Sequence, residues 1–197
     1  MEYRPLSKIT KTDLELLNIT FDRGLDIIDR IIYIFDDIDE NMAEHVVKGL
    51  AFLSKTDGPI TIMINSQGGS VNDMFAIYDA MQACECHITT IGIGEVCSAA
   101  GLLLVAGDRR LASPHTVFMA HNVAGGVDDE AEMYTAMAQM KATAMVWKMW
   151  AKCMEKHTNH TEKYWLKELG NTVRELWLNT DQMKMPKHGI IDGVWGA

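Results

Sequence analysis

The sequence predicts an α/β protein in which most strands pair in parallel. Short aliphatic and β-branched runs alternate with amphipathic segments of helical length, and glycine- or serine-containing turns separate them. The 197 residues suffice for one domain with a substantial core, and their hydrophobic share of 48% is ordinary for a globular protein.

Two strand and helix pairs are expected first. Residues 31–35 form an aliphatic run of strand length, and residues 39–54 follow as a helix. Residues 60–64 read as the next strand, and a helix over 71–83 begins at a capping-box pattern, Ser70 to Asp73. The apolar face of the helix over 39–54 consists of Met42, Val46, Leu50 and Leu53, and that of the helix over 71–83 consists of Met74, Ile77, Tyr78 and Met81.

Two further strands flank a buried helix. Residues 87–93 are rich in β-branched side chains and predict a buried strand. Residues 98–106 are small and then aliphatic, which favours a buried helix closed by Gly107. The next strand runs from Thr116 to Ala120.

A long helix is expected from Asp128 to about His157. Acidic residues lie at its start and basic residues at its end, as the helix dipole favours. Thirty residues span about 45 Å, so part of the helix should project from the body. The apolar face of this helix either packs in the core or, where the helix projects, needs a partner subunit. Its methionines are Met133, Met137, Met140, Met145 and Met149.

Composition restricts the class of protein. The net charge of −9 argues against nucleic acid as a partner, and no apolar run is long enough to span a membrane. Residues 1–22 lack clear periodicity and are expected to be a mobile segment before a single domain over 23–197. The first 20 residues lack the apolar core of a signal peptide. The four cysteines match no metal site or disulfide framework, so we expect reduced thiols and a cytoplasmic protein.

Three segments contain the parts of a serine hydrolase. Ser98 lies at a strand-to-helix turn, where unpaired N–H groups favour negative charge. His121 ends a later strand, and Gly68-Gly69 ends the strand over 60–64. These segments would supply a nucleophile, a base and backbone donors for an oxyanion.

Each of these residues also has a purely structural interpretation. Serine is among the best N-cap residues, so Ser98 could simply cap its helix. His121 could be an ordinary polar strand end, and His115, which follows Pro114 in an expected turn, is a rival base. The two glycines could form a plain turn.

Taken in order, the motifs resemble the ClpP family, the proteolytic subunits of the Clp protease. The resemblance runs from about Arg30 to Val194. Its main segments are Arg30-Ile31-Ile32-Tyr33-Ile34, Ile64-Asn65-Ser66-Gln67-Gly68-Gly69-Ser70-Val71, Gly94-Glu95-Val96-Cys97-Ser98-Ala99-Ala100-Gly101, and Pro114 through His121.

The resemblance implies a ClpP/crotonase-like fold of repeated β-β-α units with a long projecting handle helix. It also implies heptameric rings that stack as a tetradecamer around a closed chamber. A Clp-type AAA+ ATPase would deliver unfolded polypeptides, and the subunit itself would need no cofactor or metal. Ser98 would be the nucleophile and His121 the base, with the N–H groups of Gly69 and Ala99 as the oxyanion hole.

Several positions depart from the family pattern. The orienting acid is usually Asp two positions before an aromatic residue, and here Glu175 precedes Trp177; Asn171 and Asp181 are weaker candidates. Gln67 stands where the family has Pro, and Val96-Cys97 where it has two alanines. Met63 and Ala83 replace aromatic residues of the pocket that receives the ATPase loop.

The resemblance predicts a serine-type endopeptidase that works with a partner ATPase. One alternative is a non-catalytic ring subunit, which Glu175 leaves open. A less favoured alternative is an acyl-CoA enzyme of the crotonase type, which would leave the pairing of Ser98 with His121 unexplained.

Overall fold

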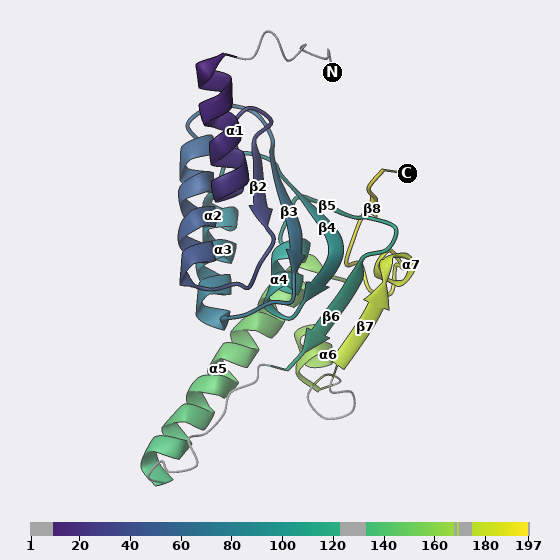
Figure 1. Ribbon diagram of the computed structural model, residues 1–197. Coiled ribbons are helices and arrows are strands. Elements are labelled where there is room, and N and C mark those ends of the chain that lie inside the picture. The colour runs from purple at the N-terminus through teal and green to yellow at the C-terminus, as the bar shows by residue number, and fades with distance from the viewer. Residues whose placement is uncertain (1–9, 123–132, 168, 170–174, 197) are drawn as a thin grey trace.

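The computed structural model describes residues 10–122, 133–167, 169 and 175–196. In this part of the chain, eight strands form one mixed sheet, shown in Figure 1. Six follow one another in space in the order β1 (Leu25–Asp26), β2 (Ile31–Ile34), β3 (Ile60–Ser66), β4 (Ile88–Cys97), β5 (Arg109–Ala112) and β8 (Gly193–Val194). The other two, β6 (Val117–His121) and β7 (Glu175–Asn179), form an antiparallel pair attached to β4.

The predicted parallel pairing is confirmed from β2 to β5. β4 is longer than the strand expected over 87–93 and has two successive partners on one side. Its first half, Thr89 to Gly92, pairs with β5, and its last residues, Glu95 to Cys97, pair with β6. Gly94 lies between the two halves with φ +66°, a left-handed conformation that suits glycine. β4 therefore connects the central sheet to the β6–β7 pair.

Three helices cover one face of the sheet: α2 (Glu40–Leu53), α3 (Val71–Ala83) and α4 (Ala99–Val105). The side chains of Ile32, Ile34, Ile62 and Ile64 on that face are fully buried. The backbone of Gly49 in α2 lies close over Ile32, and Thr90 donates a hydrogen bond to the Leu104 carbonyl of α4 at 2.7 Å. The predicted helices therefore form because their apolar faces meet this sheet.

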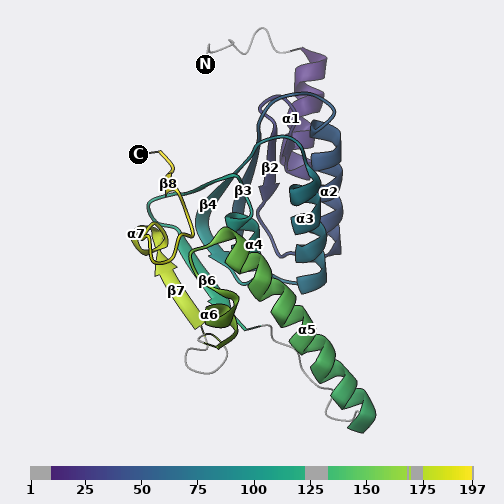
Figure 2. The ribbon, with the colours of Figure 1, turned by 180° about the vertical axis from the view of Figure 1, so that it is seen from behind.

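α5 (Met133–His157) projects from the body, as Figures 1 and 2 show. Its second half is anchored by the buried residues Trp147, Trp150, Ala151 and Met154. Its methionines at 133, 137, 140, 145 and 149 are between 46% and 66% exposed in the single chain. The projection is confirmed, whereas the predicted start at 128–132 lies outside the described residues. Within the described helices, none is long and apolar enough to cross a membrane.

A helix that the sequence analysis did not predict precedes the sheet. α1 (Lys11–Arg23) lies within the segment expected to be mobile, of which residues 1–9 are outside the described part. Thr10 and Asp13 form a reciprocal capping box at its start. Gly24, with φ +63°, ends it and accepts a backbone hydrogen bond from Tyr33 at 2.9 Å.

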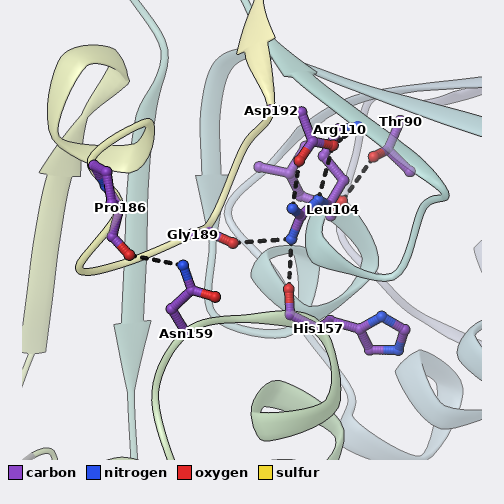
Figure 3. A network of polar contacts seen from close by, with 8 residues as sticks. All are labelled: Thr90, Leu104, Arg110, His157, Asn159, Pro186, Gly189 and Asp192. Carbon is purple, nitrogen blue, oxygen red and sulfur yellow. Dashed lines mark hydrogen bonds and ion pairs between the residues drawn. The ribbon is translucent and has the colours of Figure 1, made fainter.

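The C-terminal segment is held against the sheet by Arg110 (Figure 3). Its guanidinium forms an ion pair with Asp192 and donates to the carbonyl oxygens of Gly189 and His157. Burial raises the pKa of Asp192, but the hydrogen bonds from Arg110 outweigh it and the pKa is lowered overall. Helices α6 (Glu162–Lys167) and α7 (Thr180–Met183) also belong to this C-terminal region.

Candidate active site

Ser98 lies between β4 and α4 in an unusual backbone conformation. Its φ is +56° and its ψ −120°, values that a non-glycine residue rarely adopts. Its side chain makes no capping hydrogen bond to the helix. The N-cap interpretation is therefore wrong for the hydroxyl, although the residue occupies the N-cap position. The strained turn instead presents Oγ away from the helix backbone, the arrangement that nucleophile turns use.

His121 is the partner of this hydroxyl. Its Nε2 lies 2.7 Å from Ser98 Oγ, which is hydrogen-bond distance for a nucleophile and its base. Two features bring the pair together: β6 runs alongside the end of β4, and the Ser98 N–H donates to the Met119 carbonyl at 2.7 Å. The rival base, His115, lies exposed in the turn before β6.

Gly69 approaches another backbone segment too closely for any side chain. An added Cβ would lie 2.3 Å from the Ile38 carbonyl oxygen, and the residue has φ +149°. Its neighbours hold it there, since Ile38 donates to the Gly68 carbonyl at 2.8 Å and Ser70 donates to the Ile38 carbonyl at 2.7 Å. Within the described residues, the Gly69 N–H has no hydrogen-bond acceptor.

A small cavity brings the predicted site residues together. Its volume is about 90 Å³, and Gly69, Ser98, Ala99 and His121 all line it. Ala99 is the first residue of α4, so its N–H lacks an acceptor within the helix. Backbone donors, hydroxyl and imidazole thus meet at one space, the combination that acyl transfer requires.

Glu175 lies on the strand next to His121. The two residues are direct cross-strand partners in the antiparallel β6–β7 register. The Glu175 carboxylate, however, accepts a hydrogen bond from the Trp177 indole Nε1 at 2.8 Å. Asp181 lies in α7, beyond the other end of β7, and Asn171 falls outside the described residues.

The residues that precede Ser98 point into the core. Val96 and Cys97 are 0% and 2% exposed, and neither lines the cavity. Burial, with Glu95 adding to it, raises the pKa of the Cys97 thiol to about 11. Cys97 is therefore a neutral packing residue, and Ser98 is the nucleophile candidate of this turn.

The sequence analysis missed two tryptophans at the site. Trp150 of α5 lines the same cavity as Ser98, and Trp177 binds the Glu175 carboxylate. The sequence could have indicated the role of Trp177, because a tryptophan at the family's aromatic position adds an N–H donor that can bind a carboxylate. Trp150 reaches the site only through the packing of α5. In the described residues, no group of three or more His, Cys, Asp or Glu side chains could hold a metal ion.

Comparison with known proteins gives a consistent result. The family model described as Clp protease matches residues 23–197. A curated relative from Thermobifida fusca (strain YX), "ATP-dependent Clp protease proteolytic subunit 2", is 34% identical over 169 residues. The matched region covers 84% of this chain and 80% of that relative.

Proposed function

Because the chain belongs to the Clp protease family, we propose that it is a serine endopeptidase that hydrolyses peptide bonds inside an oligomeric chamber. The observation that carries the chemistry is the 2.7 Å contact of His121 Nε2 with Ser98 Oγ at the edge of a cavity lined by Gly69 and Ala99. The proposed mechanism uses only side chains and backbone groups of the chain and needs no cofactor of its own.

Ser98 and His121 carry the covalent step. His121 Nε2 accepts the hydroxyl proton as Oγ attacks the peptide carbonyl carbon, and the imidazolium then donates that proton to the leaving amine. The acyl-enzyme is hydrolysed by the same steps with water as nucleophile. Fixing both residues at the junction of β4 and β6 supports this role, since preorganisation removes the cost of aligning them.

Gly69 and Ala99 serve as oxyanion donors in this proposal. The tetrahedral intermediate places negative charge on the former carbonyl oxygen, and backbone N–H groups stabilise that charge strongly where water is excluded. The cavity supports the assignment because both residues border it together with Ser98.

Glu175 is proposed to orient His121. Two observations support this role: Glu175 is the direct cross-strand partner of His121, and it occupies the position of the family's orienting acid. A glutamate can fill this role in such triads. Its carboxylate would accept the Nδ1 proton of His121 and stabilise the imidazolium.

Assembly and partners follow from family membership. We propose stacked heptameric rings, with the exposed methionine face of α5 at a subunit contact. A Clp-type ATPase would supply unfolded polypeptide, and the unpaired cysteines fit a cytoplasmic setting. Neither a non-catalytic ring subunit nor a crotonase-type enzyme is favoured, because the chain retains the paired hydroxyl and imidazole.

The test uses a fluorophosphonate label and a short fluorogenic peptide. The wild-type chain should be labelled on Ser98 and should turn over the peptide, whereas Ser98→Ala should do neither and should still assemble. Ser54→Ala, a change at the exposed end of α2, is the matched control and should behave like the wild type. Turnover by Ser98→Ala within tenfold of wild type would rule out this function.

A further inference from the structure

The Glu175 carboxylate is bound by a neighbour on its own strand. Trp177 Nε1 donates to Glu175 Oε2 at 2.8 Å, and Trp177 is 54% exposed. The two side chains lie on the same face of β7, because alternate residues of a strand share a face. The hydrogen bond therefore turns the carboxylate along its own strand, toward the position opposite Met119.

In the part of the chain that the structure describes, the His121 imidazole has one hydrogen-bond partner, Ser98. Its Nε2 is engaged by Ser98, so Nδ1 is the atom that an orienting acid would contact. Among the described residues, Nδ1 has no hydrogen-bond acceptor, although Glu175 stands directly across the strand pair. The carboxylate thus has two possible donors, His121 across the strand pair and Trp177 two residues along its own strand, and it is bound to the one that does not take part in the chemistry.

The chemical character of Trp177 explains why it competes with His121 for the Glu175 carboxylate. An indole N–H is a donor that cannot accept, so a carboxylate is a suitable partner for it. Phenylalanine has no such donor. The additional methylene of glutamate over aspartate gives the carboxylate the reach to lie beside either donor.

We propose that Trp177 is a positioning residue that holds Glu175 in a resting orientation, from which the carboxylate must be released to engage His121. The inference rests on the proposed function, in which Glu175 orients His121. Among the described residues, no hydrogen bond joins Trp177 to Ser98 or His121, and in this proposal it acts on the reaction through Glu175.

The test compares four forms of the full-length, assembled chain: wild type, Trp177→Phe, Glu175→Asp and the double variant. Trp177→Phe keeps an aromatic ring and removes the donor, so kcat for a short fluorogenic peptide should rise about threefold to tenfold. In the Glu175→Asp background the shorter side chain does not reach the indole, and Trp177→Phe should change kcat less than twofold. Trp177→Met removes the same donor with a different side chain and should repeat the rise. Trp195→Phe, at another exposed tryptophan, should have no effect.

The pH dependence of kcat/KM would not change if Trp177 had only a packing role. A freed carboxylate beside the imidazolium favours the charged form, so the acidic limb of kcat/KM should shift to higher pH in Trp177→Phe. Unchanged or lowered kcat in Trp177→Phe, with Ser98 still labelled by the fluorophosphonate, would overturn the role of Trp177 and leave the proposed function standing. A wild-type chain that neither labels nor cleaves would overturn both.

Discussion

Replacing Gly69 by alanine should damage stability and activity together. The added Cβ would lie 2.3 Å from the Ile38 carbonyl oxygen and 2.8 Å from the Ile38 nitrogen, so backbone must move. The movement weakens the two hydrogen bonds that join Ile38 to Gly68 and Ser70, worth about 1 kcal/mol each. Holding alanine at φ +149° costs about 1–3 kcal/mol more. The expected loss is about 3–5 kcal/mol from a total of about 5–15 kcal/mol.

The assay is urea unfolding followed by tryptophan fluorescence at matched subunit concentration, because assembly also stabilises the fold. Gly193→Ala is the control, since its Cβ would meet only the flexible Leu111 side chain at 3.3 Å. We expect it to cost less than about 1 kcal/mol. The folded fraction of Gly69→Ala should also lose peptidase activity, because its N–H moves from the cavity. A loss below 1 kcal/mol with normal turnover would refute both the tight contact and the oxyanion role.

Three further outcomes are expected. Charge substitution at Met137 or Met140, as in Met137→Glu, should lower the mass measured in solution while the separated subunit still unfolds in a cooperative transition; loss of that transition would instead place the face in the core. Arg110→Met should cost about 2–3 kcal/mol in urea unfolding, because it leaves Asp192 without its ion pair, whereas Asp192→Asn should cost less. Lowering the pH from about 6.5 to 4 should reduce the free energy of unfolding by about 1–2 kcal/mol after solvent screening. Burial is the main reason why the pKa values of His157 and His160 fall to about 4, and unfolding returns them to about 6.5. The unfolded chain therefore binds more protons than the folded chain between these pH values. A free energy of unfolding that stays constant from pH 6.5 to pH 4 would contradict this account.

The local patterns of the chain singled out the residues at the centre of the candidate site, and the family resemblance suggested their roles. Ser98 follows a β-branched strand and precedes an apolar helix, and both elements are read from short windows. The glycine pair and His121 likewise end strands that their own residues specify. Because the carboxyl ends of adjacent parallel strands meet at one edge, these residues converge on one cavity.

Elements stabilised by distant partners could not be predicted in this way. β5 has four residues, two of them arginines, and it is a strand because it pairs with β4 and because Arg110 binds Asp192, 82 positions away. α1 was missed for a different reason: its capping box, Thr10 and Asp13, is visible in the sequence, but its apolar residues are few and Leu14 and Leu17 remain exposed. The Trp177 contact to Glu175 depends on rotamers, which no sequence pattern records.

The two partners of β4 divide the candidate site between two parts of the sheet. Ser98 and the proposed oxyanion donors Gly69 and Ala99 belong to the central sheet and α4, whereas His121 and Glu175 belong to the antiparallel β6–β7 pair. A displacement of the β6–β7 pair by about 1 Å would stretch the 2.7 Å contact of His121 with Ser98 beyond hydrogen-bond range, while Gly69 and Ala99 stayed in place. The pairing of β4 with β6 and the hydrogen bond from Ser98 N–H to the Met119 carbonyl hold the two parts together. A contact that displaces the β6–β7 pair would therefore change the alignment of His121 with Ser98 without touching the serine.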